Sequence, residues 1–208
     1  MSQPLVIDVV SDVVCPWCYL GKKRLDVALK SEPSVELRWR PFQLDPTIPP
    51  EGRDRKAYMR AKFGDGPRLG EVHAQLKGLG AEVGINFDFE AIGLAPNTLD
   101  AHRLIRFAAL SGRADALVDR LFSDYFERGR DIGDRAVLEA AARDCGLTEA
   151  AGRLESGEGS EEVRAEIDEA RRLGVEGVPF FIFAGKYAVS GAQSEAVLAQ
   201  AIAQARAG

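Results

Sequence analysis

The amino-acid sequence predicts an α/β fold whose two strand-containing halves are separated by an all-helical insertion. Short apolar runs rich in β-branched or aromatic residues lie near both ends of the chain, at residues 5–10 and 178–183. Such runs are typical of buried strands. Between residues 53 and 173 prolines are sparse, and Ala, Leu, Arg and Glu dominate, a composition that favours helices. The strands are therefore expected in the outer parts of the chain and the helices in its middle.

The first part of the chain is predicted to form a strand, a helix and a second strand. Residues 5–10 are the first strand, and residues 16–30 form a helix in which Leu25 and Leu29 recur at helical spacing. Residues 35–42 alternate apolar and polar side chains, as a half-buried strand does. Prolines at and after the end of this strand close it and open a loop, because proline lacks a backbone donor.

The middle of the chain is predicted to be helical throughout. Asn97, Asp134 and Ser160 stand where N-cap residues are preferred, just ahead of apolar residues at helical spacing. The expected helices cover residues 53–63, 67–83, 97–111, 114–127, 134–145, 148–154 and 160–173.

The last part of the chain is predicted to form a hairpin and a closing helix. Residues 178–183 and 187–190 are the two strands, with a tight turn at residues 184–186 between them. The helix follows at residues 194–206. Without the middle segment, the predicted order is βαβ followed by ββα, which is the order of a minimal thioredoxin fold.

This order predicts two domains. Residues 1–50 and 175–208 would form a thioredoxin-like domain, and residues 51–174 an inserted helical domain. The hydrophobic content of 46% is enough for a sizeable core, and the net charge of -5 gives no reason to expect a nucleic-acid partner. We see neither a signal peptide nor an apolar run of the roughly 18 residues that a membrane span needs. The cytoplasm is therefore the expected location, without a membrane partner.

The most informative feature is the sequence Cys15-Pro16-Trp17-Cys18, which follows the first strand and opens the first helix. A strand that leads into Cys-x-x-Cys at a helix start predicts a thiol–disulfide active site. If Cys15 is the N-cap, Pro16 falls at N1, where its missing N–H costs nothing. The Cys15 sulfur could then accept hydrogen bonds from the backbone N–H groups of Trp17 and Cys18, which favours a thiolate. We predict Cys15 as the nucleophile, Cys18 as the resolving cysteine, and Trp17 as an exposed surface for substrate.

A second informative feature is Val178-Pro179 at the start of the later strand. Proline is unusual there because it removes a donor from the sheet. In a thioredoxin fold, the residue at this position is a cis-proline placed against the Cys-x-x-Cys, and we expect the same of Pro179. The backbone of Val178 could then pair with an extended peptide substrate.

The chain resembles the DsbA-like oxidoreductases, and within them the FrnE-like branch. The matching stretches span nearly the whole chain in the right order: residues 11–21, 39–42, 97–104, 177–181 and 189–193. The resemblance implies a thioredoxin fold with a helical insertion, Cys15 and Cys18 as the redox pair, and Pro179 as the cis-proline. One departure from DsbA proper is the dipeptide Pro-Trp, where DsbA has Pro-His, so no imidazolium lies beside the thiolate.

The same superfamily contains 2-hydroxychromene-2-carboxylate isomerases and kappa-class glutathione transferases. Those enzymes typically carry serine at the position of Cys15 and bind glutathione. Because this chain keeps both Cys15 and Cys18, the resemblance favours dithiol chemistry. A glutathione-dependent isomerase or transferase, acting on a small aromatic or polyketide-like molecule, remains the alternative.

Three further residues carry groups capable of chemistry. His102 lies in an expected helix, where a structural hydrogen bond competes with substrate contact or proton transfer. For Cys145, the favoured role is that of a small buried hydrophobic side chain, and the alternative is a regulatory thiol. A zinc site at Cys15 and Cys18 would need two more ligands, but Cys145, His73 and His102 show no paired ligand spacing.

The sequence thus predicts a dithiol–disulfide oxidoreductase that acts on protein or small-thiol substrates. Cys15 and Cys18 carry the reaction, and Pro16, Trp17, His102, Val178 and Pro179 contact the substrate. No metal and no bound cofactor is expected, and glutathione is a candidate redox partner. A non-catalytic chaperone-like module is a further alternative, although it would leave the Cys-x-x-Cys unexplained. The oligomeric state is expected to be monomer or homodimer.

Overall fold

A four-stranded mixed sheet forms the centre of one of two compact units in the chain. The computed structural model describes residues 4–32 and 34–207. One unit, here the sheet unit, comprises the chain up to Leu44 and from Arg164 onwards, and the other, the helical unit, comprises Asp45–Val163. The boundaries predicted from the sequence were 50/51 and 174/175. The second boundary falls inside a helix because Ala170, near that helix's end, packs in the core of the sheet unit with Val10 and Phe42.

The sheet has the strand order β2-β1-β5-β6. Strand β1 (Leu5–Ser11) pairs in parallel with β2 (Val35–Pro41), whereas β5 (Phe180–Phe183) runs antiparallel to both β1 and β6 (Tyr187–Ser190). Strand β1 therefore lies inside the sheet, and the segment that carries Cys15 follows its carboxyl end. The α/β class and the thioredoxin-like arrangement predicted from the sequence are confirmed.

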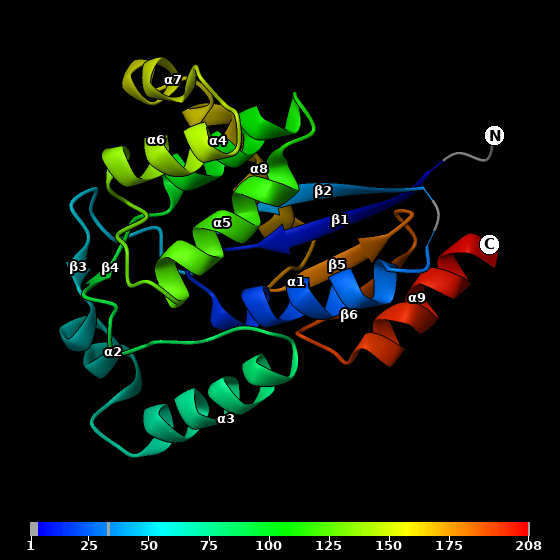
Figure 1. Ribbon diagram of the computed structural model, residues 1–208, viewed down its shortest axis with the longest axis horizontal. Coiled ribbons are helices and arrows are strands. Elements are labelled where there is room, and N and C mark those ends of the chain that lie inside the picture. The colour runs from blue at the N-terminus through cyan, green and yellow to red at the C-terminus, as the bar shows by residue number, and fades with distance from the viewer. Residues whose placement is uncertain (1–3, 33, 208) are drawn as a thin grey trace. The chain divides into compact units, whose positions relative to one another are not determined.

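Helices α1 (Pro16–Leu29) and α9 (Glu195–Ala207) lie side by side against one face of this sheet (Figure 1). Because successive side chains along a strand point to opposite faces of the sheet, the apolar residues of β1 and β5 supply a core to each face. Residues on the α1/α9 face include Leu5, Ile7, Val9, Leu25, Phe181, Phe183, Leu198 and Ile202. Each large apolar side chain buried in this way contributes roughly 1.5–3 kcal/mol. The opposite face carries Val10, Phe42, Ala170 and Val175, with Phe180 and Ile182 packed against them.

The helical unit contains six complete helices and the start of a seventh among the residues that the structure describes. They are α2 (Arg55–Phe63), α3 (Arg68–Glu82), α4 (Leu99–Ala109), α5 (Ala114–Phe126), α6 (Arg135–Asp144), α7 (Ala150–Ser156) and the first residues of α8 (Ser160–Arg172). The prediction of an all-helical insertion is wrong in one detail. Two-residue strands β3 (Arg53–Asp54) and β4 (Leu94–Ala95) pair here, and segments this short leave no periodic signal in a sequence.

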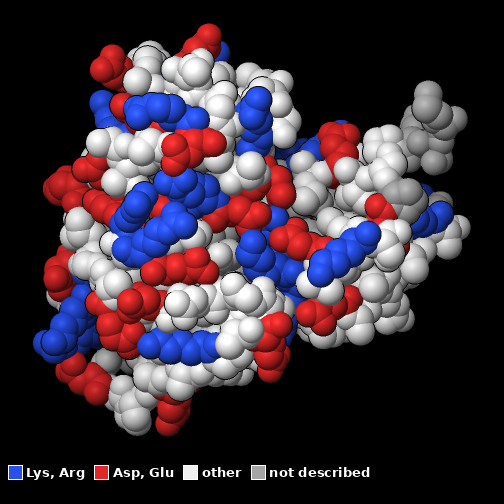
Figure 2. Space-filling view, in the orientation of Figure 1, with Lys and Arg blue, Asp and Glu red and all other residues white. Residues whose placement is uncertain are grey.

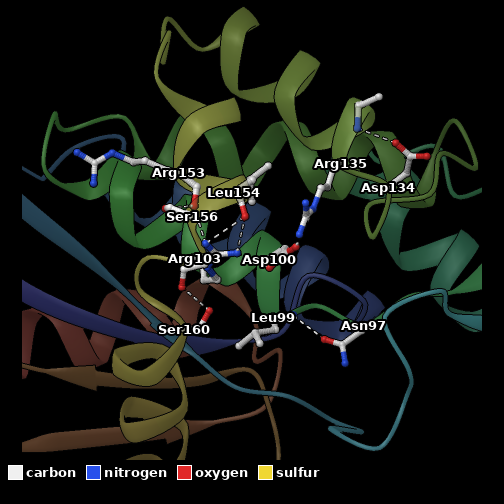
Figure 3. Close-up of polar contacts among 12 residues, drawn as sticks. Asn97, Leu99, Asp100, Arg103, Asp134, Arg135, Arg153, Leu154, Ser156 and Ser160 are labelled. Atoms are coloured by element: carbon white, nitrogen blue, oxygen red, sulfur yellow. Dashed lines mark hydrogen bonds and ion pairs between the residues drawn. The ribbon is translucent and has the colours of Figure 1, made fainter.

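Arg103 of α4 is a buried cation that joins several segments of the helical unit. Its side chain is 4% exposed and lies 2.6 Å from an oxygen of Asp100. The guanidinium also donates to the carbonyls of Arg153 at 2.6 Å, Leu154 at 3.4 Å and Glu158 at 2.8 Å. Figure 3 shows the guanidinium of Arg103 directed at the C-terminal end of α7. A planar guanidinium is suited to such a cluster because its five donors are held in one plane.

The visible surface carries charges of both signs in close alternation. In Figure 2, Lys and Arg are interspersed with Asp and Glu, and no broad basic area of the kind that attracts nucleic acid is seen on this face. In the part of the chain that the structure describes, none of the helices combines the length and the apolar character needed to cross a membrane.

Candidate active site: two thiols beside a cis-proline

The end of β1 and the start of α1 place the two active-site cysteines. After Ser11 the chain turns, and the backbone N–H of Cys15 donates to the carbonyl of Asp12 at 3.0 Å. The carboxylate of Asp12 accepts the N–H of Leu44 at 2.8 Å, which ties this turn to the segment that follows β2. Cys15 is extended, with φ -94° and ψ 113°, and Pro16 occupies the first helical position. The helix start predicted from the sequence is confirmed.

The expected cap of α1 by the Cys15 sulfur is wrong. Within the described residues, the Cys15 side chain makes no capping hydrogen bond. The N–H of Cys18 instead donates to the backbone carbonyl of Cys15 at 3.0 Å, which occupies a donor that the sulfur was expected to use. The Cys15 thiol points elsewhere and donates to the carbonyl of Val178 at 3.5 Å. The nucleophile candidate is therefore oriented by the Val178 carbonyl, in the segment just ahead of β5, and not by the start of the helix.

Cys18 lies one turn into α1 and is 2% exposed, while Cys15 is 4% exposed. Both are free thiols. Burial raises the pKa of Cys18 well above its ordinary value, and neighbouring Cys15 raises it further. The side chain of Ser11 and the backbone of Asp12 act in the opposite direction and lower the pKa of Cys18. Cys18 therefore stays a neutral thiol in the resting site, which suits a group that reacts second.

The peptide bond between Val178 and Pro179 is cis. Pro179 is buried and Val178 half-buried, and the Pro179 carbonyl accepts the N–H of Gly191 at 2.9 Å. The contact between the Cys15 sulfur and the Val178 carbonyl joins residues 163 positions apart in the chain. The structure thus brings Cys15, Cys18, Val178 and Pro179 to one end of the sheet unit. Pro16 and Trp17 are half-buried in the first turn of α1, whereas Trp17 was expected to be exposed.

Gly21 also shapes this site, although it was not among the site residues predicted from the sequence. A Cβ at Gly21 would lie 3.0 Å from Cγ of Pro179 and 3.2 Å from the Phe181 ring. The missing side chain therefore lets α1 approach Pro179, the residue after Val178. A glycine in a helix interior is unfavourable by itself and is a sequence signal of close approach.

Replacing Gly21 with alanine should therefore disturb the site. Alanine favours the helix by about 1 kcal/mol, but overpacking a dense core costs about 1–3 kcal/mol. We expect Gly21→Ala to lower the free energy of unfolding by up to about 2 kcal/mol in urea titrations, and to slow turnover by shifting Pro179. Gly78 of α3 is the matched control, because a Cβ there would meet nothing within 4 Å. If Gly21→Ala raised the free energy of unfolding as much as Gly78→Ala does, the close approach of α1 to Pro179 would be contradicted.

His102, the other predicted substrate residue, belongs to the helical unit. It is buried in α4 at 4% exposure, and its backbone N–H donates to Thr98 at 3.0 Å. Its contact with substrate stays a prediction, since the geometry within either unit does not test it. Cys145 ends α6 with its carbonyl 2.9 Å from Arg113, and burial raises the pKa of its partly exposed thiol. Among the described residues, no three His, Cys, Asp or Glu side chains are grouped as metal ligands.

The comparisons with known proteins agree with this geometry. The family model of the DSBA-like thioredoxin domain matches residues 6–203. The crystal structure of a probable DsbA oxidoreductase from Streptomyces coelicolor is 32% identical, with a TM-score of 0.88 over 98% of this chain and 90% of that one. An uncharacterized Bacillus subtilis protein, YwbO, is 28% identical over 145 residues. That match covers 68% of this chain and 66% of YwbO, slightly less than two thirds of the relative.

Two more distant structures share the fold. The cytosolic disulfide reductase DsbM from Pseudomonas aeruginosa, solved with GSH, has a TM-score of 0.67 at 20% identity and covers 98% of this chain and 96% of its own. A 2-hydroxychromene-2-carboxylate isomerase has a TM-score of 0.73 at 17% identity and covers 96% and 95%. With the family model matched over residues 6–203 and two free thiols at the start of α1, the chain belongs to the DSBA-like thioredoxin domain family.

Proposed function

We propose that the protein is a dithiol–disulfide oxidoreductase that exchanges disulfides with protein or small-thiol substrates. The observation that carries this proposal is the pair of free thiols, with the Cys15 sulfur 3.5 Å from the Val178 carbonyl and Cys18 buried behind it. Two thiols in one turn can close a disulfide without moving a distant segment. The reaction requires neither a metal nor a bound organic cofactor.

Reduction of a substrate proceeds in two exchange steps. The Cys15 thiolate attacks one sulfur of the substrate disulfide, a mixed disulfide forms, and the other substrate sulfur leaves as a thiolate that takes up a proton. Deprotonated Cys18 then attacks the Cys15 sulfur, the Cys15–Cys18 bond forms, and the second substrate sulfur leaves and is protonated. The substrate gains two electrons and two protons, and the enzyme dithiol loses them. Run backwards, the same steps oxidise a substrate dithiol.

The backbone of Val178 is the proposed binding edge for an extended peptide. Its carbonyl already accepts the Cys15 thiol, so loss of that proton on reaction frees the carbonyl for a substrate N–H. Pro16, Trp17 and Pro179 would contact the substrate around the sulfur, and His102 is a proposed contributor from the helical unit. Glutathione is the proposed small-thiol reductant, with which the structure of DsbM was solved. A cytoplasmic location and a monomeric or homodimeric state belong to the same proposal.

An insulin-reduction turbidity assay with dithiothreitol tests this function directly. The protein should shorten the lag before insulin precipitates compared with dithiothreitol alone, because thiol exchange at Cys15 bypasses the slower attack by the small thiol. Unchanged precipitation at stoichiometric enzyme would count against disulfide exchange with proteins.

The second candidate is a glutathione-dependent isomerase or transferase for a small aromatic or polyketide-like molecule. The shared fold with 2-hydroxychromene-2-carboxylate isomerase supports it. In that reaction glutathione would bind without the thiols cycling. Calorimetric titration with the non-reacting S-methyl glutathione separates the two candidates when it is combined with the insulin assay. Tight binding together with no insulin reduction would favour the isomerase or transferase.

A further inference from the structure

Ser11 stands at the junction between the central strand and the active-site turn. It is the last residue of β1, 4% exposed, and its carbonyl accepts the N–H of Phe42 at 3.0 Å. Side chains two apart on a strand share a face, so Ser11 lies on the face of Ile7 and Val9. That face packs against Leu25 of α1, the helix that carries Cys18. The register of β1 therefore aims the Ser11 hydroxyl at the helix that holds the resolving cysteine.

The Ser11 hydroxyl is a buried donor that the folded backbone does not use. Among the residues that the structure describes, Oγ of Ser11 has no hydrogen-bond partner. A buried polar atom without a partner is costly and calls for an explanation. The side chain of Ser11 nevertheless lowers the pKa of the Cys18 thiol, as does the backbone of Asp12. A hydroxyl rotates freely about its C–O bond, so it can turn to a sulfur that becomes charged.

The resolving step requires a negative charge on the Cys18 sulfur, which is buried. Cys18 must lose its proton before its sulfur can attack Cys15, yet burial and neighbouring Cys15 both disfavour its thiolate. A hydrogen bond to an ionised sulfur is stronger than one to a neutral thiol. We infer that Ser11 is a positioning residue for the second half of the reaction, whose hydroxyl holds the Cys18 thiolate while it attacks the mixed disulfide. This role rests on the proposed function.

Direct titration of Cys18 tests the hydrogen bond without any turnover. The chain has three cysteines, so the double variant Cys15→Ser/Cys145→Ser leaves Cys18 as its sole thiol. Its ultraviolet thiolate absorbance is followed against pH, with and without Ser11→Ala. We expect Ser11→Ala to lower the acid ionisation constant of Cys18 about tenfold, as for loss of one hydrogen bond to a charged group. An unchanged titration midpoint would overturn the inference.

Threonine and valine at position 11 form a matched pair that separates the hydroxyl from packing. The two side chains have nearly the same shape, and both fit a strand, but only threonine can donate. We expect Ser11→Thr to keep the Cys18 midpoint nearer that of the serine protein and Ser11→Val to shift it as alanine does. Equal midpoints for threonine and valine, at comparable melting temperatures, would assign Ser11 a packing role only. If Ser11→Ala folds poorly, the threonine and valine variants still show whether the hydroxyl at position 11 lowers the pKa of Cys18.

A kinetic experiment tests the role in the reaction. Reduced protein with Cys15 and Cys18 intact is mixed with glutathione disulfide, quenched with acid, and the mixed disulfide is followed by mass spectrometry. Ser11→Ala should form the mixed disulfide at the wild-type rate and resolve it about tenfold more slowly at neutral pH. Equal resolution rates would remove Ser11 from the reaction. If the wild-type protein forms no mixed disulfide, the proposed function fails, while the titration of Cys18 still decides whether the hydrogen bond exists.

Discussion

Replacing Cys15 with serine is expected to abolish insulin reduction, so that precipitation falls to the rate with dithiothreitol alone. A serine hydroxyl is not ionised at neutral pH and cannot form a disulfide, so neither exchange step remains. The substitution removes one sulfur and retains the size of the side chain. It also removes the thiol that donates to Val178, but a serine hydroxyl can still donate to a carbonyl. The expected loss is therefore chemical, with melting temperature as the control for folding.

Two matched variants make this result specific. Cys18→Ser should still attack the substrate but should not release it, so the mixed disulfide accumulates and is visible by mass spectrometry. Cys145→Ser should reduce insulin at the wild-type rate, because that thiol lies at the end of α6 in the helical unit. Wild-type insulin reduction by Cys15→Ser would refute the assigned nucleophile. A protein that does not reduce insulin but suppresses its aggregation, equally well with Cys15→Ser, would favour the chaperone-like alternative.

The architecture could be predicted where side-chain periodicity is strong. The apolar run of β5 and the alternation along β2 mark strands, and both are confirmed. The paired segments β3 and β4 were missed because two residues cannot show a period. The end of α8 was assigned to the insertion because a helix looks the same in sequence whichever core its end packs into. Its contact between Ala170 and Val10 depends on tertiary structure.

The candidate site was predictable in its chemistry and less so in its orientation. The two cysteines and Pro179 are recognisable in the sequence, and the thioredoxin fold predicted from the order of elements already implied that this proline is placed against the Cys-x-x-Cys. The direction of the Cys15 sulfur could not be predicted. The thiol can rotate either to accept a helix N–H or to donate to the Val178 carbonyl, and the sequence does not show which contact is preferred. Gly21 and Ser11 were missed for a related reason. Their effects come from what lies across the core, and neither residue type is reactive by itself.

Removing the side chain of Arg103 is expected to have the largest effect on stability. In Arg103→Ala, the carbonyls of Arg153, Leu154 and Glu158 lose their charged donor. Asp100 loses its ion-pair partner at 2.6 Å and keeps the more distant Arg135 at 3.8 Å. Breaking a buried ion pair by removing one partner costs about 3–5 kcal/mol. Since Asp100 is partly exposed and water can reach it, we expect a loss of about 3 kcal/mol in the free energy of unfolding. Urea denaturation of the whole chain measures it.

Arg135 is the matched control, because its guanidinium also faces Asp100, at 3.8 Å, but its side chain is 56% exposed. Exposed ion pairs contribute about 0–1 kcal/mol, so Arg135→Ala should change stability little. Arg103→Lys should recover only part of the loss, since an ammonium cannot reproduce the planar fork that reaches Asp100 and the carbonyls together. Protease cleavage within residues 150–158 should rise in Arg103→Ala and not in Arg135→Ala. Equal stabilities for the two alanine variants would mean that the Arg103 cluster contributes no more than a surface pair does.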